Sequence, residues 1–339
     1  YVKSTQFQHL VGLYLKSFPG IDKDRGYTVT FDNGETLKVK RHVWHGEFFR
    51  QSPSRNAFKW INRYRGKDFK TEMLNDSTAY IGLQTFNLDE LSTDSIRDFI
   101  AGHITIPHLI VDVRNNGGGN DAVLHRILSY CSDKPYASLK HHNKINRRGH
   151  FASMAHCKNY FPEMEIFGEE YKEEEGYDGL YTREDESCIM PDSVVAYSGK
   201  LYVLVNENSC SAATLFPANI LRSHRGIIIG RETRTAYSYM TALKFADFIL
   251  PNSHYIWRIP LVKCIFDETI SPRIPHGRGV IPDVYVPLTY DEVAFTNGDA
   301  ILNRALQMIA DGEYLSDNPF EENNNSTQDT SYAVVVSII

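Results

Sequence analysis

The sequence predicts an α/β fold in which buried strands alternate with helices, and two stretches support this prediction. In the first, residues 201–205 form a continuous apolar run, helical spacing of apolar residues follows over 212–225, and residues 227–229 form the next apolar run. In the second, an apolar run at 109–113 precedes a helical pattern at 121–130. Short continuous apolar runs are typical of strands buried on both faces, and their alternation with helices indicates β-α-β units.

Ser211 lies at the predicted start of the helix that follows the 201–205 strand. The first backbone N–H groups of a helix are unpaired and stabilise negative charge. A serine at this place can attack a carbonyl carbon while an adjacent N–H, here that of Ala212, holds the oxyanion. Asn208 and Ser209 are typical helix N-caps, so the alternative at this point is that Ser209 and Ser211 only cap the helix.

The second stretch ends in a glycine-rich turn formed by Gly117, Gly118 and Gly119. Consecutive glycines allow backbone geometries that are closed to other residues, and they let a ligand approach the main chain closely. The run lacks both the Lys-Ser/Thr of a P-loop and the spacing of a dinucleotide fingerprint. It therefore argues against a nucleotide cofactor.

Together the two stretches resemble the carboxy-terminal processing (tail-specific) and tricorn-type serine peptidases. Residues 112–119 read Asp-Val-Arg-Asn-Asn-Gly-Gly-Gly and are similar to the family motif Asp-Leu-Arg-x-Asn-x-Gly-Gly. Residues 211–214 read Ser-Ala-Ala-Thr and resemble the nucleophile motif Ser-Ala-Ser/Ala-Glu, with Thr214 in place of the glutamate. Further blocks follow in family order: Gly-Arg-Glu-Thr at 230–233, Leu-Pro-Asn-Ser at 250–253 and Gly-Val-Ile-Pro-Asp at 279–283.

The resemblance implies a crotonase-like (β-β-α) core and a serine endopeptidase that hydrolyses protein or peptide substrates without a cofactor. Ser211 is then the nucleophile, and the N–H groups of Ala212 and of Gly118, or its neighbour Gly119, form the oxyanion hole. Residues 112–116 are expected to shape the turn and not to contact substrate. Relatives with a PDZ-like module are mostly bacterial and exported, so the resemblance also implies a periplasmic or cell-envelope location.

The resemblance does not identify the general base. The lysine position of the processing peptidases holds Ala236, and Lys244 lies inside a predicted strand. The tricorn-like branch uses a histidine from a Gly-His-Thr motif that this sequence lacks, and a glutamate near 276–278, where no acid is present. Either the base lies in a segment upstream of this sequence, or the protein is an inactive relative that binds peptides. A crotonase-like acyl-thioester enzyme is a further alternative, although such chemistry needs no serine at position 211.

The chain is expected to comprise four regions. Residues 1–42 hold two alternating runs joined by an Asn-Gly pair, which is typical of a hairpin, and resemble the truncated end of a PDZ-like module. Residues 43–77 are predicted as a connector. The core spans 78–310, with an insertion at 135–198 that is rich in Tyr, His, Lys and Glu and could cap the cleft. Residues 311–339 form a polar tail that ends in a strand-like run.

Within the core, apolar patterns predict further elements. In chain order these are a strand at 78–86, a helix at 93–101 capped by Ser92 or Thr93, a strand pair at 239–249 and 254–259, a short strand at 284–286 and a helix at 299–310.

Composition narrows the function classes. The chain has 339 residues, 42% of them hydrophobic, which is enough for a large core. A net charge of −6 argues against a nucleic-acid partner, and no apolar run reaches membrane-spanning length. The histidines and the five cysteines show no metal-ligand spacing and no disulfide framework, so no metal is expected. Cys210, next to Ser211, is interpreted as a small buried thiol. The sequence gives no indication of the oligomeric state.

Overall fold

The computed structural model describes residues 27–30, 36–39, 68–137, 141–146, 172–173, 175, 180–185, 188–250, 256–266, 274–288, 299–314 and 336–337. Contacts divide the chain into two compact units. We call Gly66–Pro287 with Arg304–Tyr314 the core unit, and the remaining residues the terminal unit.

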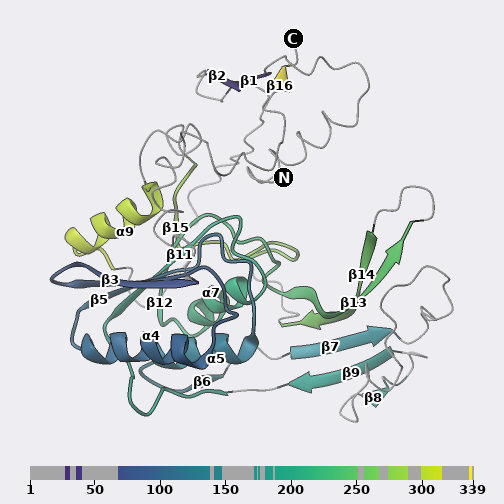
Figure 1. Cartoon of the computed structure of the whole chain (residues 1–339), viewed down its shortest axis with the longest axis horizontal. Coiled ribbons are helices and arrows are strands. Elements are labelled where there is room, and N and C mark those ends of the chain that lie inside the picture. The colour runs from purple at the N-terminus through teal and green to yellow at the C-terminus, as the bar shows by residue number, and fades with distance from the viewer. Residues whose placement is uncertain are drawn as a thin grey trace. The chain divides into compact units, whose positions relative to one another are not determined.

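A six-stranded sheet with the order β15-β12-β11-β5-β4-β3 organises the core unit (Figure 1). Neighbouring strands are parallel except for the pair of β3 and β4. The α/β prediction is thus confirmed as a mixed α/β fold, and β3 adds an antiparallel edge strand from the segment that we predicted as a connector. The strands are β3 (Phe69–Asn75), β4 (Thr78–Leu83), β5 (His108–Asp112), β11 (Lys200–Val205), β12 (Gly226–Gly230) and β15 (Val284–Tyr285).

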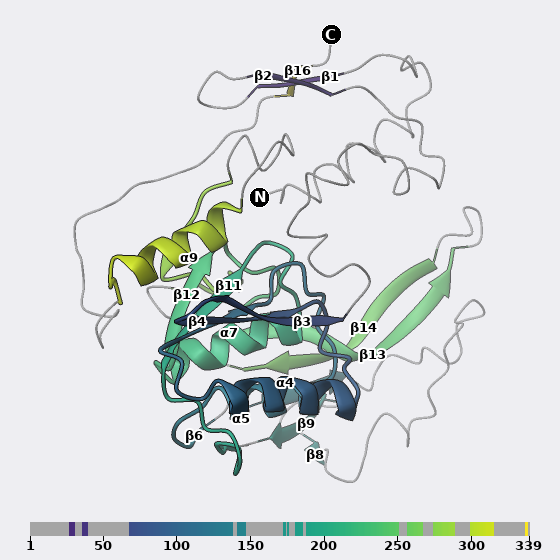
Figure 2. The same cartoon turned by 60° about the vertical axis from the view of Figure 1, so that its left-hand side comes forward.

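Three helices connect the parallel strands: α4 (Glu90–Gly102), α5 (Asp121–Tyr130) and α7 (Ala212–Arg222). Each crossover advances the sheet in the same direction, and right-handed crossovers then place all three helices on one face, as Figures 1 and 2 show. The hydrophobic core fills the space between this face and the helices. Every residue of α7 from Ala212 to Leu221 is buried, which explains the nearly continuous apolar sequence of this helix.

Two helix boundaries differ from the sequence prediction. α4 begins at Glu90, and the Asp89 side chain caps it by accepting a hydrogen bond from Ser92 N at 2.9 Å, so neither Ser92 nor Thr93 is the cap. The sequence prediction missed the first turn of α4 because it followed the apolar stripe that packs on the core. The apolar residue of the first turn, Leu91, is exposed and does not belong to this stripe. α7 ends at Arg222, and Gly226 begins β12 instead of ending the helix.

A second sheet in the core unit has five antiparallel strands in the order β13-β14-β7-β9-β8 (Figure 1). The predicted strand pair is confirmed as β13 and β14, although β14 extends further than expected. The insertion supplies the other three strands. A small pair, β6 with β10, also lies there. The elements are β6 (Tyr136–Ala137), β7 (His141–Asn146), β8 (Lys172–Glu173), β9 (Leu180–Asp185), β10 (Cys188–Ile189), β13 (Tyr239–Ile249) and β14 (Ile256–Ile265).

In the terminal unit, β1 (Tyr27–Thr30) and β2 (Thr36–Val39) form the predicted antiparallel hairpin. The strand-like run near the end of the sequence contributes β16 (Val336–Ser337), which pairs with β1 as an added edge strand. The predicted helix at 299–310 is confirmed as α9 (Ala300–Ala310). None of the described helices has both the length and the apolar content needed to cross a bilayer.

Candidate active site

Three turns of the core unit meet at one edge of the six-stranded sheet. They are residues 113–120 after β5, 206–211 after β11 and 231–238 after β12. The three strands are parallel neighbours, so their carboxyl ends lie side by side and the turns that follow them converge.

Ser211 occupies the N-cap position of α7 with φ 54° and ψ −125°. Its side chain makes no capping hydrogen bond, while its carbonyl oxygen accepts from Thr214 N at 2.7 Å and Leu215 N at 3.0 Å. Ser209 does not cap α7 either, because its hydroxyl donates to Val113 O at 2.9 Å. The interpretation of these serines as helix caps is therefore wrong. A positive φ at a non-glycine residue costs free energy and persists only where the surroundings enforce it, which is typical of functional sites.

The glycine turn packs directly against Ser211. A Cβ atom on Gly118 would lie 2.7 Å from Ser211 Cβ and 2.8 Å from Cys210 O, and a Cβ on Gly119 would lie 2.5 Å from the carbonyl carbon of Phe86. Both glycines also have positive φ, 102° and 150° respectively. The fold therefore brings the two predicted stretches into contact, and it does so at positions where only glycine fits.

The two glycines differ in whether their N–H is available for an oxyanion. Gly118 N donates to Asn116 Oδ1 at 2.8 Å and is therefore occupied. Among the hydrogen bonds of the described residues, none uses the N–H of Gly119 or of Ala212. Of the two glycines proposed from the sequence, Gly119 is thus the one with a free donor.

Asn116 fixes the turn from inside the protein. Its Nδ2 donates to Leu83 O at 3.1 Å, at the end of β4, while its Oδ1 accepts from Gly118 N. Its backbone carbonyl accepts from Cys210 N at 2.9 Å. One buried residue thus connects β4 and the glycine turn through its side chain and the segment that carries Ser211 through its backbone.

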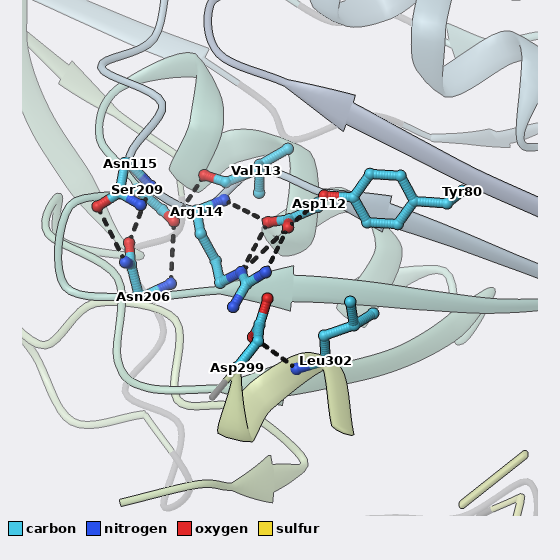
Figure 3. Close-up of polar contacts among 9 residues, drawn as sticks. All are labelled: Tyr80, Asp112, Val113, Arg114, Asn115, Asn206, Ser209, Asp299 and Leu302. Atoms are coloured by element: carbon cyan, nitrogen blue, oxygen red, sulfur yellow. Dashed lines mark hydrogen bonds and ion pairs between the residues drawn. The ribbon is translucent and has the colours of Figure 1, made fainter. Parts of the chain in front are cut away.

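A second set of polar contacts joins the turns after β5 and β11 (Figure 3). Asn115 N donates to Asn206 Oδ1 at 3.0 Å, and Asn115 Oδ1 accepts from Asn206 Nδ2 at 3.1 Å and from Asn208 Nδ2 at 2.9 Å. Ser209 Oγ accepts from Asn206 N at 3.1 Å and donates to Val113 O. The reciprocal bonds fix the relative position of the two turns.

The carboxylate of Asp112 is buried and fully engaged (Figure 3). It accepts from Tyr80 Oη at 2.7 Å and from Arg114 Nη2 at 2.6 Å, and Arg114 N donates to its Oδ1 at 3.0 Å. These contacts brace the end of β5 and leave no free carboxylate for proton transfer.

The turn after β12 contacts the nucleophile segment. Thr235 Oγ1 accepts from Ser211 N at 2.8 Å and lies 3.4 Å from Cys210 Sγ. Glu232, in the same turn, accepts from Arg278 Nη2 at 2.7 Å and from Gly279 N at 2.8 Å. Arg278 lies where the tricorn-like branch would have a glutamate, and it pairs with an acid from the opposite turn.

Comparison with known proteins then identifies the family. Residues 77–286 match peptidase family S41. The chain belongs to peptidase family S41. This confirms the resemblance that the motifs indicated. The chain is 23% identical over 239 residues to a Chlamydia trachomatis protein and 22% identical over 240 residues to a Chlamydia muridarum protein. The alignments cover 59% and 60% of this chain but 38% of each relative, so the chain spans less than half of their length.

A solved structure shows the same fold. The structure of mature CPAF complexed with lactacystin has a TM-score of 0.50 and 16% identity to this chain, covering 86% of this chain and 68% of that one.

Among the described residues, no candidate general base contacts Ser211. Ser211 Oγ lies 3.9 Å from Met240 Sδ, and a thioether is only a weak hydrogen-bond acceptor. No described histidine, lysine or carboxylate is hydrogen-bonded to Ser211 Oγ. The Lys244 side chain lies outside the described residues, as do His42 and His45. The described residues also contain no cluster of side chains that could hold a metal ion.

Sequence reasoning missed several residues of the S41 site. Thr235 lies just beyond the Gly-Arg-Glu-Thr block, and Met240 is the second residue of β13. Asn206 directly follows the last residue of β11. Hydroxyl, thioether and amide side chains at such places are common in turns, so only the fold shows that these three contact the motif residues.

Proposed function

We propose that this chain is the catalytic part of a serine endopeptidase in which Ser211 attacks the carbonyl carbon of a peptide bond. The N–H groups of Ala212 and Gly119 bind the oxyanion of the tetrahedral intermediate. The observation that carries the proposal is the conformation of Ser211, which is held at positive φ with its hydroxyl not used as a cap and with the glycine turn in contact.

The two proposed donors suit this chemistry. Ala212 is the first residue of α7, where the helix dipole adds partial positive charge, and the glycine turn lets a substrate carbonyl approach the main chain. Loss of one such donor in a serine peptidase lowers kcat by about a hundredfold or more.

The proton of Ser211 needs an acceptor. We propose that the general base comes from outside the described residues, and two kinds of source fit: a residue upstream of this sequence, or a side chain such as that of Lys244. The relatives are more than twice as long as their aligned region, which supports the first.

The alternative function is an inactive relative that binds peptides. Met240 is the observation that favours it, since a thioether beside the nucleophile cannot accept its proton at neutral pH. Ala236 at the lysine position and Thr214 at the glutamate position agree with this alternative.

A fluorophosphonate serine probe separates the two functions. We expect covalent labelling that disappears with Ser211→Ala and persists with Ser95→Ala, a serine on α4 that serves as the matched control. The longer natural protein, if one exists, is labelled in parallel. Labelling of the longer form alone places the base upstream, whereas no labelling of either form supports the peptide-binding alternative.

We further propose a crotonase-like description of the core, a PDZ-like module ending at residue 42 and an exported or envelope-associated protein. The β1–β2 hairpin is compatible with the second of these, and the family resemblance supports all three. A PDZ-like module predicts that the longer protein binds carboxy-terminal peptides through that region, which fluorescence anisotropy with labelled peptides would measure.

A further inference from the structure

We propose that Thr235 is a positioning residue whose hydroxyl holds Ser211 in its strained conformation and assigns the oxyanion hole to Ala212 and Gly119. The inference rests on the proposed role of Ser211 as the nucleophile. It goes beyond that role by naming a residue outside every sequence motif, on a turn that follows a different strand.

The central contact is the hydrogen bond from Ser211 N to Thr235 Oγ1 at 2.8 Å. The bond joins a residue at the start of α7 to the turn after β12, 24 positions further along the chain. The same oxygen lies 3.4 Å from Cys210 Sγ, so the Thr235 hydroxyl contacts both the backbone N–H of Ser211 and the side chain of Cys210.

This bond matters because it holds the N–H side of the peptide group that precedes Ser211, while the carbonyl oxygen of the same group, that of Cys210, accepts from Ala213 N at 3.0 Å. The Ser211 carbonyl is fixed by the first turn of α7, through Thr214 N and Leu215 N. Its N–H has Thr235 Oγ1 as its partner among the hydrogen bonds of the described residues. An L-residue at φ 54° and ψ −125° returns to an ordinary conformation unless both flanking peptide groups are held.

The hydroxyl also decides which N–H groups can face an oxyanion. The N–H of a nucleophilic serine is itself a possible oxyanion donor, but that of Ser211 is committed to Thr235. Gly118 N is likewise committed to Asn116 Oδ1. The two N–H groups that no described hydrogen bond uses, those of Ala212 and Gly119, belong to the start of α7 and to the glycine turn.

The turn that presents Thr235 is itself anchored. Thr233 N donates to Val280 O at 3.2 Å, and Val280 N donates to Thr233 Oγ1 at 2.8 Å. A Cβ on Gly279 would overlap the Thr233 carbonyl, so only glycine lets the segments approach this closely. Because Thr235 lies two residues beyond this anchored point, its hydroxyl position is set by the fold and not by a flexible side chain alone.

The test compares Thr235→Val with Thr235→Ser. Valine keeps the shape and removes the hydroxyl, whereas serine keeps the hydroxyl. Thr93→Val is the matched control, since Thr93 is a buried threonine on α4 whose Oγ1 donates to Glu90 O. Two quantities are measured: the second-order rate constant of fluorophosphonate labelling, and hydrogen–deuterium exchange of the peptide that contains Ser211.

With Thr235→Val we expect the labelling rate constant to fall by about tenfold to a hundredfold, because one buried N–H loses its partner and the strained conformation loses a restraint. We expect the Ser211 amide to exchange faster in the same variant. Thr235→Ser keeps labelling within about threefold of wild type and keeps the amide protected, since the acceptor oxygen remains. Thr93→Val leaves both quantities unchanged.

The two measurements separate failure of this inference from failure of the proposed function. If the wild-type chain and its longer form do not label, the nucleophile role fails, and amide exchange still decides whether Thr235 holds Ser211. If Thr235→Val labels and exchanges like wild type, the positioning role is overturned. It is also overturned if Thr235→Ser behaves like Thr235→Val, because then the methyl group and not the hydroxyl is what matters.

Discussion

At the scale of single residues, the site is defined by which hydrogen-bonding groups are occupied and which are free. The side chain of Ser211 makes no capping hydrogen bond to α7. The N–H groups of Gly118 and Ser211 each donate a hydrogen bond to a side chain. Among the described hydrogen bonds, the N–H groups of Ala212 and Gly119 remain unused, and the Ser211 hydroxyl contacts only a thioether, that of Met240. The positive φ of Ser211 therefore lowers the stability of the fold at this residue, while hydrogen bonds fix the residues around it.

Replacing the strained serine by glycine should therefore stabilise the protein. We expect Ser211→Gly to raise the free energy of unfolding by about 1 kcal/mol relative to Ser211→Ala, because glycine adopts positive φ without strain. Denaturant unfolding measures the difference. The matched control is Ser95→Gly inside α4, which should lower stability by about 1 kcal/mol. A Ser211→Gly variant that is less stable than Ser211→Ala would contradict the strained conformation.

The motifs identified Ser211, Ala212 and the glycines without any structure, because backbone geometry at a strand-to-helix turn restricts residue type. They could not distinguish Gly118 from Gly119, since the difference lies in which of the two N–H groups is bound by the Asn116 amide oxygen. They also could not identify Thr235, which enters the site only because β12 lies beside β11.

At the scale of elements, the glycine turn between β5 and α5 carries the steric constraint that lies against Ser211. We expect Gly118→Ala to lower fluorophosphonate labelling at least about a hundredfold, since the added Cβ meets Ser211 Cβ and Cys210 O and the residue has φ 102°. Gly117→Ala is the control, because a Cβ there meets nothing within 4 Å. Equal labelling of the two variants would show that the turn does not contact the nucleophile in solution.

Helix α4 offers a test of capping away from the site. Asp89→Ala should lower the free energy of unfolding, because Ser92 N loses its acceptor and the carboxylate no longer faces the helix N-terminus. Asp89→Asn keeps an acceptor oxygen and should retain most of the stability. Chemical denaturation of the three proteins at one pH measures the effect, and a loss as large in Asp89→Asn would assign it to charge and not to the cap.

The elements with strong periodicity were predictable, including β4, β5, β11, β12 and the helices between them. The strands β7, β8 and β9 were not, because their residues are mostly polar and their pairing joins distant segments: Ile145 of β7 pairs with Val262 of β14, and His141 of β7 pairs with Asp185 of β9. Pairing between distant segments decides such strands, and a local pattern contains little information about it.

At the scale of the whole molecule, two buried thiols make the stability of the core unit depend on pH above pH 9. Burial raises the pKa of Cys131 to about 12, and burial, with a smaller contribution from Asp121, raises the pKa of Cys264 to about 12. Both thiols are protonated in the folded protein at a pH where the unfolded chain has lost the proton. The free energy of unfolding that these raised pKa values contribute is therefore fully present below about pH 9 and is lost between pH 9 and pH 12.

We expect the free energy of unfolding to fall through this window by about 1.4 kcal/mol per pH unit for each thiol. Cys131→Ala should be less stable at neutral pH, because it leaves a cavity, yet its stability should depend less on pH above 9. Cys188→Ala, at an exposed position, is the control and should follow the wild-type curve. Urea unfolding at a series of pH values gives the slopes, and identical slopes for Cys131→Ala and wild type would refute the assignment.

The buried amide of Asn116 has a consequence for the chemical ageing of the protein. Asn116 precedes Gly117, and an asparagine followed by glycine is the pair that most readily cyclises to a succinimide and deamidates, provided that its side chain can rotate toward the next backbone nitrogen. Here the bonds to Leu83 O and Gly118 N prevent that rotation as long as the fold is intact. Each unfolding event exposes the pair, and an aspartate formed there has no N–H to donate to Leu83. Chains that deamidate while unfolded therefore lose one of the hydrogen bonds that form the turn beside Ser211. Folding protects Asn116, and with it the geometry of this turn, from deamidation.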